Sequence, residues 1–119
     1  AELKKAYSVL RNSGIIFIAL PNFESLVAQA DTFYWKMKSW PNHLFYFTEK
    51  TLRAMLTKTG FHVVDTFTHL GEADYRDDAR VVRDRFHLAA EKDVREAIQC
   101  LWTLGKGQEL VMIARKGSQ

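Results

Sequence analysis

An unbroken run of apolar residues over 15–20 is the strongest local signal in the chain. The run has the length of a strand, and the lack of alternation with polar residues predicts burial on both faces of a parallel sheet. Residues 2–12 place apolar side chains on one helical face, and Gly14 predicts the end of that helix. Pro21 predicts the end of the strand, and a short helix is expected over 24–30.

Both ends of a third helix are specified by the sequence around residues 49–59. The hydroxyl of Thr48 is placed to cap the first turn, where Glu49 also interacts favourably with the helix dipole. Gly60 is the residue type that most often ends a helix in the left-handed conformation. A strand is expected to follow over 61–70, and its polar residues predict an edge position in the sheet.

Helical periodicity returns over 79–104, where apolar residues recur at steps of three and four. The pattern leaves open whether this segment is one helix or two, with a break near 89–90. Residues 71–78 ahead of it predict a polar connection. Alternating aspartates and arginines over 74–85 predict a solvated helix face with local ion pairs.

The last part of the chain predicts a turn and a third strand. Gly105-Lys106-Gly107 follows a helical segment and precedes a strand, which is the reverse of the order that phosphate binding requires. We therefore interpret it as a turn that ends the helix. The strand over 109–115 is apolar in its middle, and this predicts a central position in the sheet.

The order of these elements resembles the C-terminal half of class I S-adenosylmethionine (SAM)-dependent methyltransferases. The resemblance rests on two motifs: a buried strand that ends in Pro21-Asn22, and a segment in which a histidine precedes Tyr46-Phe47-Thr48 and the next helix ends in Gly60-Phe61. It implies an α/β fold, a partial Rossmann-like sheet of three strands whose last strand is antiparallel and lies between the other two. It also implies that residues 1–119 are a fragment, the C-terminal portion of a single methyltransferase domain.

The glycine-rich turn with which this family binds SAM is not found among the six glycines of the chain. The resemblance therefore implies that SAM is held by an N-terminal half absent from this sequence, and that the chain alone neither binds the cofactor nor transfers a methyl group. Strand 15–20 would then lack a neighbour on one edge. Such an edge favours pairing with the missing half, or a homodimer through the same edge.

Residues 31–47 form an aromatic-rich loop, which the resemblance places as an acceptor wall beside the methyl-donor pocket. His43 matches a histidine of the family motif and is a candidate catalytic residue, because imidazole can take a proton from an attacking hydroxyl or amine. Asn22 would orient the acceptor, although an Asx turn at the strand end explains it equally well. The other candidate substrate-binding residues, for which packing on the sheet is the alternative, are Tyr34, Trp35, Trp40 and Tyr46.

Composition narrows the remaining classes of function. The 17 basic and 14 acidic side chains interleave along the chain, so nucleic-acid binding is not expected. No metal-ligand pattern stands out, and the absence of a membrane-spanning run favours a cytoplasmic protein. Cys100 lies among apolar residues and predicts a buried thiol. The alternative to part of an enzyme is a non-catalytic α/β module that binds a partner protein through the aromatic loop and the helical segment 79–104.

Overall fold

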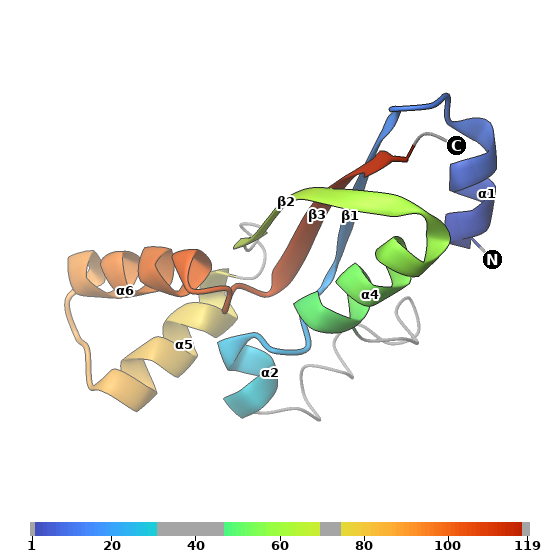
Figure 1. The fold of residues 1–119 in the computed structure, drawn as a ribbon. Coiled ribbons are helices and arrows are strands. Elements are labelled where there is room, and N and C mark those ends of the chain that lie inside the picture. The colour runs from blue at the N-terminus through green and yellow to red at the C-terminus, as the bar shows by residue number, and fades with distance from the viewer. Residues whose placement is uncertain (1, 31–46, 70–74, 118–119) are drawn as a thin grey trace.

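The structure is a computed structural model of the 119-residue chain, and it describes residues 2–30, 47–69 and 75–117. The described segments combine helices with strands, and helices lie between successive strands, in agreement with the α/β prediction (Figure 1). In chain order they are α1 (Glu2–Val9), β1 (Ile15–Pro21), α2 (Leu26–Ala30), α4 (Glu49–Thr59), β2 (Phe61–His69), α5 (Tyr75–Phe86), α6 (Glu91–Thr103) and β3 (Glu109–Lys116).

Strand β3 lies between β1 and β2 in a three-stranded sheet. Both outer strands run antiparallel to β3, with Ile15 opposite Arg115 and Phe61 opposite Lys116. Since β1 and β2 share this relation to β3, they are parallel to each other. The predictions of a central last strand, antiparallel to its neighbours, and of an edge position for the strand after Gly60 are confirmed.

Helix α4 begins and ends where its local signals predict. The hydroxyl of Thr48 accepts a hydrogen bond from the Thr51 backbone N–H at 3.1 Å, and the Thr51 hydroxyl accepts one from the Thr48 N–H at 2.9 Å. This reciprocal pair is a capping box in which threonine replaces the usual glutamate or glutamine. Gly60 ends the helix with a φ of 110°, and its N–H donates to the carbonyls of Leu56 and Thr57.

Helices α1 and α4 pack on one face of the sheet (Figure 1). The even-numbered residues of β1 contact this core, while Ile15 and Phe17 on the other face are 53% and 63% exposed. The prediction that β1 is buried on both faces is therefore wrong for this chain, because an unbroken apolar run does not guarantee that the same chain covers both faces. The buried residues of the core are Leu52, Leu56, Phe61, Leu110, Met112 and Ala114.

Lys116 attaches the end of β3 to helix α1. Its ammonium group donates hydrogen bonds to the carbonyls of Tyr7 at 2.6 Å and Leu10 at 2.8 Å, and it lies 4.3 Å from the centre of the Tyr7 ring. A cation in this position satisfies carbonyls that the last helical turn leaves without backbone partners. Helix α1 ends at Val9, earlier than the predicted residue 12, and the chain turns at Ser13 with a φ of 66°.

Helices α5 and α6 form a pair that extends away from the sheet, with α2 packed beside α5 (Figure 1). The segment predicted over 79–104 is thus two helices, separated at residues 87–90, and the first begins at Tyr75. The prediction of a polar connection over 71–78 is consequently wrong from residue 75 onward. The core between these helices is formed by Ala79, Val82, Val94, Ile98 and Leu101.

Three side chains of this helix pair correct the sequence predictions. Asp77 and Asp78 are 9% and 1% exposed, so they do not belong to a solvated face. The Gln108 amide donates a 2.6 Å hydrogen bond to Asp78, a tertiary contact that local charge patterning does not reveal. Cys100 is exposed, and the prediction of a buried thiol is therefore wrong.

Candidate functional site

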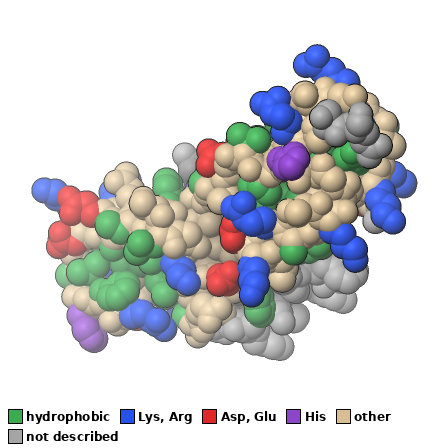
Figure 2. Space-filling view, in the orientation of Figure 1, with side chains coloured by type: hydrophobic (Ala, Val, Ile, Leu, Met, Phe, Trp, Pro, Cys, Tyr) green, Lys and Arg blue, Asp and Glu red, His purple; other side chains and the backbone are tan. Residues whose placement is uncertain are grey.

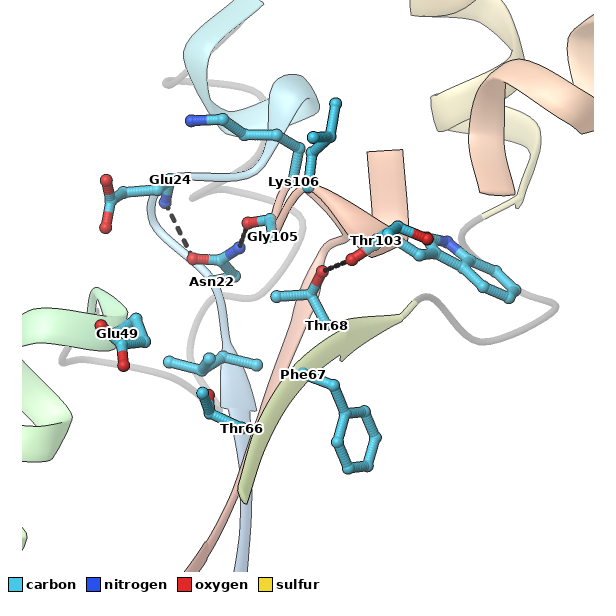
Figure 3. A pocket seen from close by; sticks show the side chains of 12 residues that line it. Asn22, Glu24, Glu49, Thr66, Phe67, Thr68, Thr103, Gly105 and Lys106 are labelled. Carbon is cyan, nitrogen blue, oxygen red and sulfur yellow. Dashed lines mark hydrogen bonds between the residues drawn. The ribbon is translucent and has the colours of Figure 1, made fainter. Parts of the chain in front are cut away.

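A hollow of about 590 Å³ lies at the carboxyl ends of the parallel strands β1 and β2 (Figure 3). Ligands of open α/β sheets bind in this position, because loops that follow parallel strands converge there. The turn between α6 and β3 and the first turn of α4 complete its wall. The lining residues are Asn22, Glu24, Glu49, Thr66, Phe67, Thr68, Trp102, Thr103, Leu104, Gly105, Lys106 and Leu110.

Asn22 follows β1 and connects the strand to the turn after α6. Its side chain is 1% exposed, and the amide nitrogen donates to the carbonyls of Gly105 at 3.0 Å and Gly107 at 2.9 Å. The amide oxygen accepts a hydrogen bond from the Glu24 N–H at 3.1 Å, which confirms the predicted Asx turn (Figure 3). The Asn22 backbone N–H also donates to the Gln108 carbonyl at 2.7 Å. Both amide protons are therefore used within the fold, and the amide oxygen has a second lone pair for another donor.

Two threonines of β2 line the hollow in different chemical situations. The buried Thr68 hydroxyl donates to the Trp102 carbonyl at 2.9 Å and accepts from the Gly107 N–H at 3.0 Å. Thr66 also lines the hollow, but its buried hydroxyl oxygen has no hydrogen-bond partner within the described part of the chain. The Trp102 indole nitrogen is also buried without a hydrogen-bond partner among the described residues. Thr68 thus supports the turn, while Thr66 contributes no such bond.

Replacing Thr68 by valine should lower the free energy of unfolding by about 1–3 kcal/mol. The substitution keeps the side-chain shape but leaves the Trp102 carbonyl and the Gly107 N–H without this partner. Urea denaturation monitored by tryptophan fluorescence measures the change. Thr66→Val is the matched control, and it should be neutral or slightly stabilising because no hydrogen bond is lost. Equal destabilisation by both variants would contradict the role assigned to Thr68.

Charged groups of both signs lie along the lining of the hollow. Glu49 stands in the first turn of α4 and forms an ion pair with Arg53 at 2.6 Å. Glu24 and Lys106 are exposed and form no ion pair with a described residue. Since one ammonium group accompanies two carboxylates, the hollow does not present a single sign of charge to a ligand.

The structure places Asn22 in the wall of the hollow, while the other predicted site residues lie outside the described residues: Tyr34, Trp35, Trp40, His43 and Tyr46. Phe47, the last residue of the predicted aromatic loop, packs against the core under α4, and its carbonyl accepts the Phe23 N–H at 2.9 Å. Sequence reasoning missed Thr66, Thr68 and Trp102. The parallel alignment of β1 and β2, which the resemblance implied, was the signal that could have identified the end of β2.

A second polar cluster joins α5 to α6, away from the hollow. The Tyr75 hydroxyl donates to Glu91 at 2.6 Å, and Arg83 donates to the same carboxylate at 2.6 Å. The tyrosine hydrogen bond has the largest influence on the pKa of Glu91 and lowers it. Desolvation opposes this shift, and the charges of Arg83 and Arg95 lower the pKa further. The same bond, with desolvation, raises the pKa of Tyr75. The contact therefore stabilises the helix pair at neutral pH. Its contribution is lost at low pH, as the Glu91 carboxylate takes up a proton, and at high pH, as the Tyr75 hydroxyl loses one.

The described residues do not provide the elements of a cofactor or metal site. Among the described glycines, Gly60 and Gly105 end helices, Gly14 and Gly107 precede strands, and Gly117 follows β3, so none leads from a strand into a helix. No group of three histidine, cysteine, aspartate or glutamate side chains in the described segments is arranged to hold a metal ion. None of the helices within the described ranges is long and apolar enough to cross a bilayer.

No protein-family model matches the chain, and no curated protein matches it. Among solved structures, the chain is similar to a SAM-dependent methyltransferase from Archaeoglobus fulgidus, with a TM-score of 0.52 and 23% sequence identity. The match covers 96% of this chain and 50% of that one, so the chain spans half the length of the structure it matches. The sheet, its antiparallel central strand and its helices therefore form part of a methyltransferase-like, Rossmann-like α/β fold.

Proposed function

We propose that this chain is the C-terminal, acceptor-side part of a SAM-dependent methyltransferase and is inactive by itself. The observation that carries the proposal is the similarity of nearly the whole chain to half of a methyltransferase structure. The antiparallel β3 between β1 and β2 supports it, because the resemblance in sequence implies this same strand order. A cytoplasmic location is part of the proposal.

SAM would be held by a preceding half of the domain. The described glycines do not fit the strand-to-helix turn that SAM binding requires in this family, so we assign no step of methyl transfer to the described residues. The contribution of this chain is to hold the acceptor at the carboxyl ends of β1 and β2. In the proposal, Asn22 orients the acceptor through the free lone pair of its amide oxygen, and Tyr34, Trp35, Trp40 and Tyr46 form the adjoining wall.

The partner of the chain would be that preceding half, paired with the free edge of β1. Among the described residues, β1 is hydrogen-bonded on one edge, to β3. An apolar groove of about 980 Å³ runs between α1, β1 and α4, and its lining includes Ile16, Ile18 and Leu52. A further strand with apolar side chains would complete the edge and fill the groove.

A homodimer through the same edge is the alternative for the isolated chain. Replacing Phe17 by lysine should reduce self-association, because this 63% exposed side chain would bring a charge beside the paired edges. Sedimentation velocity over a range of concentrations measures the effect. Phe86→Lys is the matched control, since Phe86 is 49% exposed on α5, away from β1. A chain that stays monomeric at every concentration would exclude the homodimer.

Isothermal calorimetry with SAM tests the proposed function. The protein extended upstream should bind SAM, and the 119-residue chain should not. Binding by neither would overturn the methyltransferase proposal and leave the alternative of a non-catalytic α/β interaction module. Binding by the short chain would overturn the assignment of the cofactor to a preceding half.

His43 would take a proton from the acceptor. Replacing His43 by alanine in the extended protein should reduce kcat by about 10²-fold or more, which is the usual contribution of a general base. The thermal midpoint should stay unchanged. An unaltered kcat would exclude the catalytic role.

A further inference from the structure

Helix α5 carries a row of arginines along its exposed face. Arg76, Arg80 and Arg83 follow one another at steps of four and three residues, and this spacing places them on one side of a helix. All three are exposed, while Asp78, Val81 and Val82 on the opposite side of the helix are buried. The row therefore lies on the exposed side of α5, with Arg83 close enough to α6 to contact Glu91.

The charge of this row is only partly neutralised within the chain. Arg83 forms an ion pair with Glu91 at 2.6 Å, whereas Arg76 and Arg80 form none with a described carboxylate. Asp84 is the one exposed acid of α5, because Asp77 and Asp78 are buried. Like charges at these spacings oppose helix formation. The row thus has a local cost, and its members Arg76 and Arg80 have no compensating ion pair among the described residues.

An exposed aromatic side chain lies close to the row. Phe86, in the last turn of α5, is 49% exposed, although the helix has its own buried core. Figure 2 shows hydrophobic side chains gathered over the end of the α5–α6 pair, with basic side chains beside them. An exposed aromatic side chain on the same helix as two unpaired guanidinium groups is a combination found at protein interfaces, where aromatic residues and arginine are enriched.

We propose that this face of α5 docks an acidic segment of a partner protein. The planar guanidinium groups of Arg76 and Arg80 suit carboxylates, which accept two hydrogen bonds at once, and Phe86 offers contact area to an apolar residue of the same segment. Nucleic acid fits this face less well, because Asp84 and Glu91 lie among the arginines and the basic surface is one short row. Because the α5–α6 pair extends away from the sheet (Figure 1), docking here leaves the hollow beside β1 open. The inference does not depend on the proposed methyltransferase function.

Fluorescence anisotropy with a labelled glutamate-rich peptide that contains one leucine tests the proposal. The double variant Arg76→Glu/Arg80→Glu should bind the peptide about tenfold more weakly than the wild-type chain. The matched control is Arg11→Glu/Lys50→Glu, which makes the same change in net charge at two exposed positions outside α5. Its affinity should fall by about twofold or less, because distant surface charges are screened.

A second variant keeps the test independent of charge. Phe86→Ala should fold normally, as checked by circular dichroism, and should weaken peptide binding about threefold through the lost apolar contact. Equal losses of affinity in the α5 double variant and its control would overturn the proposal. It would also be overturned if neither the α5 double variant nor Phe86→Ala bound the peptide more weakly than the wild-type chain. Tighter binding of a single-stranded RNA, lost in the α5 double variant, would also overturn it and assign the face to nucleic acid.

Discussion

Replacing Asn22 by aspartate should destabilise the fold by about 3–5 kcal/mol, a large part of the total stability of a small domain. The amide nitrogen that donates to the carbonyls of Gly105 and Gly107 would become an oxygen that repels both. The new carboxyl group would also be buried, as Asn22 is 1% exposed. Chemical denaturation at neutral pH measures the loss.

The pH dependence of this variant adds an independent check. Burial and the two facing carbonyls raise the pKa of the new carboxyl above that of the unfolded chain. The folded state therefore binds the proton more tightly, so the destabilisation should be smallest below about pH 4 and should grow as the pH rises. Asn12→Asp is the matched control, because Asn12 is exposed in the turn after α1. A loss no larger than that of the control would contradict the structural role of Asn22.

Replacing Gly60 by alanine should cost about 2–4 kcal/mol, from an unfavourable backbone conformation and a steric clash together. Gly60 has a φ of 110°, and a methyl group there would lie 2.8 Å from the Tyr7 ring. That ring has little freedom to move, because it packs edge-on against Phe61 and lies beneath the Lys116 ammonium group. Urea denaturation of the variant measures the loss.

Gly105→Ala separates the two contributions to this loss. Gly105 has a φ of 79°, but no atom lies within 4 Å of the position that its methyl group would take. Its replacement should therefore cost about 1–2 kcal/mol, from the backbone conformation alone. If the two alanine variants lost equal stability, the result would contradict the close contact between Gly60 and the Tyr7 ring of α1.

The element with local signals at both ends was the one whose limits the sequence predicted most closely. Helix α4 matches the predicted range because Thr48 and Gly60 act through neighbouring backbone groups. Burial depends on distant segments and was predicted less well. Asp78 is covered through Gln108, thirty residues further along the chain, and the open face of β1 depends on which segments pack against it.

The candidate site could be predicted from the sequence only in part. Asn22 was found because it follows a strand and a proline, which is a local pattern. Thr66 and Thr68 reach the same hollow from a strand more than forty residues away, and their hydroxyl groups differ only in the neighbours that the turn after α6 provides. The aromatic candidates and His43 stay predictions.

The position of β3 has a consequence for how the protein acquires its structure during synthesis. Both other strands pair with β3 and not with each other, yet β3 follows every other described element in the chain. While the ribosome is producing the preceding residues, β1 and β2 have no strand partner within the described chain, and their apolar side chains stay open to chaperones or to aggregation. Formation of the sheet is therefore delayed until the residues of β3 have left the exit tunnel, and the pairings that then form are long-range and slow.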